Sequence, residues 1–168
     1  GGVLVGTEGM ASWLSKSQSG FTNVSLFEPE SSDEEDKDSG YTMYADRAKE
    51  SGLKRIPGAA FKAHIDNTHP LGFGMKEQLY ALKFSADVFE LNPDLLAIGR
   101  YVNDPNDILA SGYASLENKE KAASNSFAAV QNMGQGKVVL LLENTQYRMF
   151  WIGPSRMIQN AVFQLPAH

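Results

Sequence analysis

The sequence predicts a mixed α/β sandwich. Two observations point to this class. Apolar residues follow helical spacing near both ends of the chain, at 10–14 and 148–165, whereas the apolar segments between them alternate or run continuously, as strands do. A chain of 168 residues has the length of one domain, so we expect a single domain over 1–168.

The composition removes several classes of function. The net charge is −5 and Lys and Arg never occur more than two together, so the chain lacks the basic face that nucleic acids need. The absence of cysteine excludes disulfides, thiolate zinc sites and a Cys nucleophile. No apolar run approaches the roughly 20 residues that cross a bilayer, so no membrane span is predicted.

The first element is a short strand, Val3–Val5, that turns sharply at Gly6–Gly9 into a helix beginning near Met10. We refer to residues 6–9 as the elbow, because several hydrolase folds present a nucleophile on such a strand-to-helix turn. Here its tip carries Thr7 and Glu8. Helix capping accounts for both: Thr7 is expected to cap the helix with its hydroxyl, and Glu8 to lie at the positive end of the helix dipole.

The segment 28–40 contains seven acidic residues and one lysine. Such a run buries too little apolar area to offset the entropy of ordering it, so we expect a mobile, solvated insertion. The alternating ligands and central glycine of a calcium-binding EF-hand loop are absent.

The remaining pattern predicts a helix over Tyr41–Ser51 and then a series of strands, at 59–66, 79–85, 95–102, 126–131 and 137–143. The last of these strands is continuously apolar, as expected for a strand covered on both faces. The C-terminal helix is expected to turn five apolar side chains inward, those of Ile152, Met157, Ile158, Ala161 and Val162.

Three histidines, His64, His69 and His168, are the natural candidates for metal binding or proton transfer. Their spacing matches no zinc motif, so no metal site is predicted in this chain. His69 precedes a proline in a loop, where its ring nitrogens are expected to fix a tight turn by bonding backbone groups. Asp66 and Thr68 are expected to stabilise the same turn through their short side chains.

Two further functions remain open from the residues alone. In the first, a stand-alone hydrolase uses Thr7 or Glu8 together with His69. In the second, exposed aromatic rings bind a sugar or a peptide, with Tyr113, Tyr147 and Trp151 as the candidate rings.

Several segments resemble a known module in order along the chain: GGVLVG, IPGAAFKAHIDNTHPLGFGM, SGY at 111–113 and GQGKVVLLLENTQYRMFWIGPSRMIQNAVF. They are similar to the class I glutamine amidotransferase-like domain that follows the catalytic domain in some bacterial zinc carboxypeptidases. The resemblance runs from Gly2 to Phe163, and its most specific parts are Asp66–Gly74 and Arg148–Ala161.

This resemblance implies a flavodoxin-like three-layer sandwich and a non-catalytic, accessory role. The family's zinc ligands belong to the upstream peptidase domain, so the resemblance implies no cofactor in this chain and zinc in the parent protein. Active amidotransferases carry Cys at the elbow, where Thr7 stands here, followed by Glu8. The resemblance also implies a bacterial protein that is periplasmic or secreted.

Such domains carry βα units before the elbow strand, whereas this chain starts at that strand. We therefore expect a fragment of a larger protein, truncated at its N-terminus. The expected partners are the upstream peptidase domain or, through an open sheet edge at Val3–Val5, a second copy.

Overall fold

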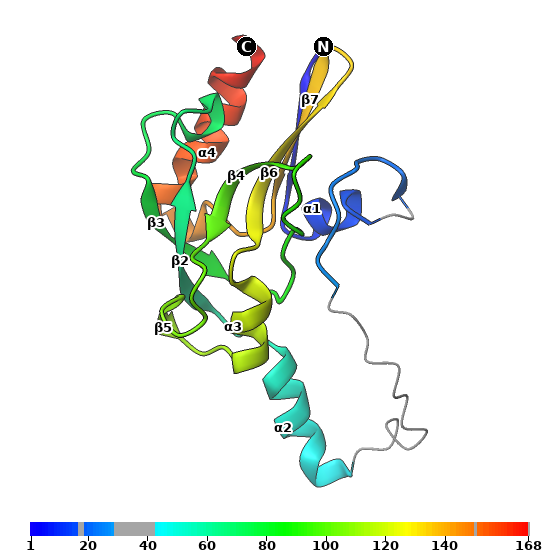
Figure 1. Cartoon of the computed structure of the whole chain (residues 1–168), viewed down its shortest axis with the longest axis vertical. Helices are drawn as coiled ribbons and strands as arrows, with labels where there is room; N and C mark the ends of the chain where they lie inside the picture. Colours follow the sequence, from blue (N-terminus) through cyan, green and yellow to red (C-terminus); the bar gives the residue numbers. More distant parts are fainter. Residues whose placement is uncertain (17–18, 29–42, 150, 168) are drawn as a thin grey trace.

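The computed structural model describes residues 1–16, 19–28, 43–149 and 151–167 (Figure 1). It is a mixed α/β structure around a seven-stranded sheet. The strands are β1 (Val3–Thr7), β2 (Ala59–Ile65), β3 (Gln78–Lys83), β4 (Leu96–Tyr101), β5 (Leu109–Gly112), β6 (Ser126–Met133) and β7 (Gly136–Leu141). The helices are α1 (Gly9–Leu14), α2 (Tyr44–Lys54), α3 (Leu116–Ala122) and α4 (Ile152–Phe163), with short 3-10 turns η2 (Pro70–Gly72), η3 (Tyr147–Met149) and η4 (Leu165–Ala167).

The sheet has the order β1-β7-β6-β4-β2-β3, and β5 pairs with β2. Among the described strands, β1 and β7 are the one parallel pair, and the other pairings are antiparallel. The two parallel strands therefore lie at one edge of the sheet, and β1 is the edge strand. The predicted mixed α/β class is confirmed, and the arrangement is compatible with the predicted sandwich.

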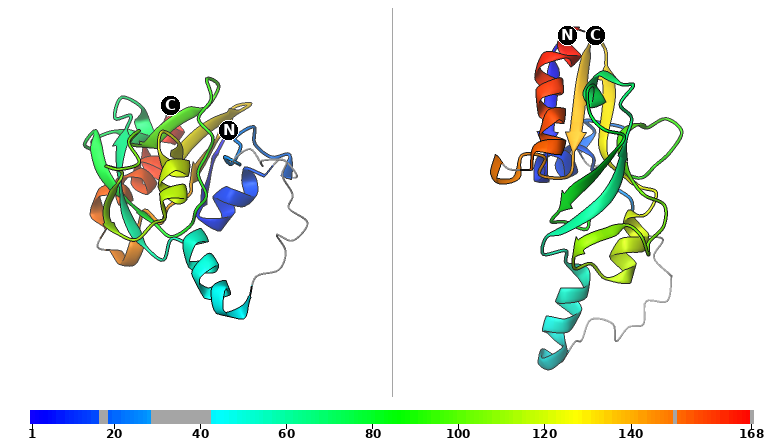
Figure 2. Two further views of the ribbon diagram at one scale, coloured as in Figure 1. Left: turned by 60° about the horizontal axis from the view of Figure 1, so that its bottom comes forward. Right: turned by 90° about the vertical axis from the view of Figure 1, so that its left-hand side faces the viewer.

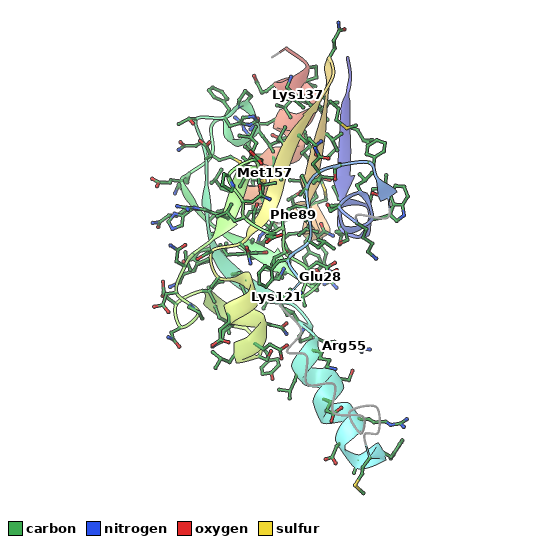
Figure 3. All side chains as sticks on the ribbon, turned by 45° about the vertical axis from the view of Figure 1, so that its right-hand side comes forward. Glu28, Arg55, Phe89, Lys121, Lys137 and Met157 are labelled. Atoms are coloured by element: carbon green, nitrogen blue, oxygen red, sulfur yellow. The ribbon has the colours of Figure 1, made fainter. Side chains whose placement is uncertain are left out.

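Helix α4 contacts both β1 and β3, which are the two ends of the strand order. The sheet therefore curves around this helix, as the two views of Figure 2 show. Met157 and Ala161 are buried as predicted, and Figure 3 shows Met157 pointing into the molecule.

The prediction was wrong for the two outermost apolar residues of α4, since Ile152 is 76% exposed and Val162 is 55% exposed. Ile152 is the first residue of the helix. Val162 follows Met157 by five residues, which places it about 140° around the helix from the buried side.

The predicted strands are confirmed, with β2 alternating between buried and half-buried residues along its whole length. The apolar strand β7 lies between β1 and β6, and Val138–Leu141 are all buried. Strand β5 and helix α3 were not predicted. Helix α2 starts at Tyr44, continues through Gly52, and extends away from the sheet in Figures 1 and 2.

The predicted acidic insertion lies almost wholly outside the described residues, which include only Glu28 of it. Among the helices that the structure describes, none combines the length and the apolar character that a membrane span requires.

Candidate functional site at the strand-to-helix turn

The elbow forms where β1 ends beside β7. Thr7 is still part of the strand, paired with Leu141, and the Glu8 amide donates a hydrogen bond to the Leu141 carbonyl at 2.8 Å. Glu8 then adopts φ 50° and ψ −124°, and α1 begins at Gly9. The residue with the strained backbone is therefore Glu8, which is the tip of the elbow.

The predicted cap is wrong, because Glu8 rather than Thr7 occupies the N-cap position and no side chain caps the helix. The reason is the pairing with β7, which keeps Thr7 in extended conformation and delays the helix by one residue. Gly6 allows α1 to fold back tightly, since a Cβ atom there would lie 2.9 Å from the Leu14 Cδ1 atom.

A cavity of about 260 Å³ opens beside the elbow. Its lining combines the turn, the first part of α1 and the loops after β3 and β7: Glu8, Gly9, Ser12, Phe84, Ser85, Asp87, Leu142, Glu143 and Asn144. The Ser12 hydroxyl donates to the Asp87 carboxylate at 2.7 Å, which joins α1 to the β3 loop. Among the described residues, the cavity wall contains three carboxylates and no histidine.

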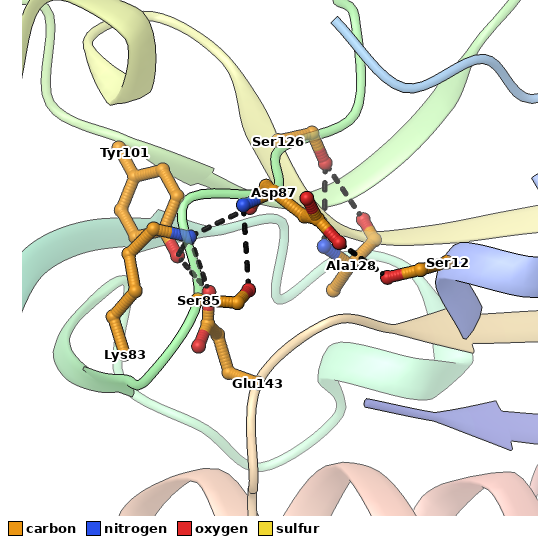
Figure 4. A network of polar contacts seen from close by, with 8 residues as sticks. All are labelled: Ser12, Lys83, Ser85, Asp87, Tyr101, Ser126, Ala128 and Glu143. Atoms are coloured by element: carbon orange, nitrogen blue, oxygen red, sulfur yellow. Dashed lines mark hydrogen bonds and ion pairs between the residues drawn. The ribbon is translucent and has the colours of Figure 1, made fainter. Parts of the chain in front are cut away.

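Glu143 of this wall also belongs to a buried polar cluster with Lys83 and Tyr101 (Figure 4). The Lys83 Nζ atom donates to Glu143 Oε1 at 2.8 Å and to the Asp87 carbonyl at 2.7 Å. The Tyr101 hydroxyl donates to the same Glu143 oxygen at 2.5 Å. Lys83 and Tyr101 are fully buried, and Glu143 is 3% exposed.

This cluster connects the edge strand β3 to the segment that follows β7, across the curved sheet. A buried ion pair is favourable only when further hydrogen bonds satisfy both charges, and here Asp87 and Tyr101 supply them. Burial first, and then the charge and hydrogen bond of Glu143, raise the pKa of the Tyr101 hydroxyl well above its ordinary value of 10.0. The Lys83 amine is held in a structural ion pair by its bonds to Glu143 and the Asp87 carbonyl.

The raised pKa predicts a pH dependence of stability. The folded state holds the Tyr101 proton more tightly than the unfolded state does. The stability that this proton contributes is therefore complete below pH 10.0 and is lost progressively above it. Above pH 10.0 the free energy of unfolding is expected to fall by up to about 1.4 kcal/mol per pH unit. Urea unfolding from pH 9 to 11 measures it, with Tyr101→Phe as the matched variant that lacks this proton. Equal slopes for both proteins would contradict the assignment.

The structure also shows what the predicted residues of the His69 loop do. His69 Nδ1 accepts a hydrogen bond from the Leu71 amide at 3.1 Å and thus caps η2. The Asp66 carboxylate accepts from the amide and the hydroxyl of Thr68, and the hydroxyl bond is the main cause of the lowered Asp66 pKa. The predicted structural role of this turn is confirmed.

The elbow and the His69 loop are not brought together. The register places Thr7, Leu141, Ala128, Gly99 and Ile65 in one row across the sheet. Thr7 and Ile65 are thus four strand spacings apart, about 19 Å along the sheet. After this row, the segment that follows Thr7 and the segment that follows Ile65 continue in opposite directions, because β1 and β2 run antiparallel.

The three candidate aromatic residues do not form one platform. Tyr147 packs against Phe84 with ring centroids 5.2 Å apart, and the Trp151 indole donates to the Tyr80 carbonyl at 3.0 Å. Tyr113, which is 50% exposed, comes from a different part of the fold, directly after β5. In the part of the chain that is described, no three His, Asp or Glu residues converge as metal ligands would.

Sequence reasoning missed Ser12, Lys83, Asp87, Tyr101 and Glu143. One signal was available for Lys83: it follows Leu79 and Ala81 at alternate positions of β3, on the side that faces the core. A lysine at such a position needs a buried anion. Glu143 was visible as the charged end of a continuously apolar strand.

Comparisons of this chain with models of protein families, with curated proteins and with solved structures gave no match.

Proposed function

We propose that this chain is a non-catalytic accessory domain of a zinc-dependent carboxypeptidase, whose peptidase domain lies outside the sequence. The observation that carries the non-catalytic part of the proposal is the chemistry of the elbow, whereas the carboxypeptidase parent rests on the resemblance along the sequence. The turn has the sharp shape used to present a nucleophile, yet its tip is Glu8, and the described residues of the adjoining cavity wall include no histidine. Acyl transfer needs a nucleophile with a base in hydrogen-bond reach.

The position of Lys83 supports the same proposal. An amine can act as a base when it is accessible and unpaired, but Lys83 is fully buried and bound to Glu143 and the Asp87 carbonyl. The groups around the elbow are therefore arranged to hold the fold together.

We also propose that the domain is of the flavodoxin-like, class I amidotransferase-like type. The resemblance along the sequence supports this assignment, and the βα unit formed by β1 and α1 beside the parallel strand β7 is the part of the sheet that fits it, whereas the other described pairings are antiparallel. The open edge of β1, with Leu4 39% exposed, is where an upstream segment of the parent protein or a second copy would pair. A monomer whose β1 amides exchange freely would contradict such pairing.

The proposal predicts that the purified chain does not hydrolyse glutamine, simple amides or activated esters above the buffer rate. Thr7→Ala and Glu8→Gln are expected to change nothing in these assays, because among the described residues the Thr7 hydroxyl makes no hydrogen bond to a base and the Glu8 carboxylate bonds only to the Asn144 amide. Turnover that either substitution abolished, with the fold intact by circular dichroism, would contradict the non-catalytic assignment and favour a hydrolase.

A further inference from the structure

A second cavity, of about 510 Å³, lies on the outer side of β2 and β3. Its lining shares no residue with the cavity at the elbow. The side chains that define it are Lys62, His64, Lys76, Gln78, Tyr80 and Asp107. Its volume falls within the range of about 300–1,000 Å³ typical of small-molecule sites.

The strand register explains how these side chains come together. Ala59, Phe61, Ala63 and Ile65 of β2 are buried, so Lys62 and His64 point to the opposite, outer face. Lys62 is paired directly with Tyr80, and His64 is paired with Gln78 on one side and Arg100 on the other. Directly paired residues of an antiparallel sheet place their side chains on the same face.

This outer face is rich in cations although the whole chain carries a net charge of −5. Lys62 forms an ion pair with Asp107, and this hydrogen bond raises the pKa of the Lys62 amine. The side chains of Lys76 and Arg100 make no hydrogen bond or ion pair with any residue that the structure describes. Gathering like charges on one face costs stability unless an anion offsets them.

We propose that this cavity binds a small molecule that carries a carboxylate or phosphate group on a flat apolar body. Lys76 supplies the uncompensated positive charge, and the Gln78 amide supplies a neutral donor beside it. The Tyr80 ring, which is 54% exposed, forms a side wall for the flat part of the ligand. This site is independent of the proposed accessory role, since none of its residues belongs to the elbow.

The test is a heteronuclear NMR titration of the full chain with benzoate, phenyl phosphate and the neutral analogue benzamide at constant ionic strength. We expect saturable shifts of the Lys62, His64, Gln78 and Tyr80 amides with benzoate or phenyl phosphate, and the tighter of the two identifies the anionic group. Lys76→Gln is expected to weaken binding about fivefold, the effect of one partly exposed charge contact.

Two further variants make the test specific. Asp107→Asn removes the carboxylate that competes for Lys62 and is expected to tighten binding about two- to threefold, which a damaged fold does not do. Lys54→Gln, at the end of α2, removes a lysine outside the cavity and is expected to leave binding unchanged. Three results would each overturn the proposal. Benzamide could bind as tightly as benzoate and phenyl phosphate, neither anion could give saturable shifts, or the Lys76→Gln protein could bind with unaltered affinity.

Discussion

Replacing Lys83 by methionine is expected to lower the free energy of unfolding by about 3–5 kcal/mol. Methionine fills much of the same volume, so the cost is mainly electrostatic. Glu143, which is 3% exposed, would keep the Tyr101 hydrogen bond but lose its cation, and the Asp87 carbonyl would lose its donor. Urea unfolding followed by tryptophan fluorescence measures the change.

A double variant separates charge from packing. Adding Glu143→Gln to Lys83→Met removes the buried, unpaired negative charge, while the amide oxygen still accepts a hydrogen bond from Tyr101. At least half of the lost free energy of unfolding is therefore expected to return. Lys62→Met, which breaks the exposed ion pair with Asp107, is the matched control and is expected to lower stability far less than Lys83→Met does. A Lys83→Met protein as stable as the Lys62→Met protein would show that the buried cluster does not hold the sheet.

Asn160→Asp is expected to cost about 3–5 kcal/mol at pH 7. The buried Asn160 amide donates to the Leu71 carbonyl at 2.8 Å and to the Phe73 carbonyl at 2.9 Å, and so fixes the His69 loop to α4. An aspartate of the same shape places a carboxylate against two carbonyl oxygens. Thermal and urea unfolding measure the loss.

The pH dependence and a neighbouring residue provide the controls for this substitution. At pH 4 the new acid is protonated in part and donates one hydrogen bond, so the variant is expected to recover part of the loss relative to wild type. Gln159→Glu, on the exposed side of the same helix, is expected to change stability by less than about 0.5 kcal/mol. Equal stability of the Asn160→Asp and Gln159→Glu proteins at pH 7 would contradict the role of the amide.

Local patterns predicted most of the secondary structure, because each strand carries its own periodicity. The alternation of β2 and the continuous apolar run of β7 are examples of a local signal that the structure confirms. The direction of strand pairing is not local. The curvature around α4 depends on contacts between β1, β3 and a helix far along the chain, and no single segment encodes them.

The same limit applies to the candidate site. The elbow was predicted from a strand followed by glycines, but the N-cap of α1 was misplaced by one residue because the pairing of Thr7 with Leu141 decides where the strand ends. Lys83, Tyr101 and Glu143 come from three separate segments, and only the folded sheet brings them together. The hydrogen bonds made by the Asp66 and His69 side chains reach only two residues along the chain, and this role was predicted.

The most direct test of the non-catalytic elbow is covalent trapping. The intact chain is treated with a fluorophosphonate and with a chloroketone analogue of glutamine, and the adducts are located by peptide mass spectrometry. The account predicts no selective modification of Thr7 or Glu8, because the residues described around the adjoining cavity include no histidine or thiol to support attack. A stoichiometric adduct on Thr7 or Glu8, absent after prior unfolding of the chain, would contradict it.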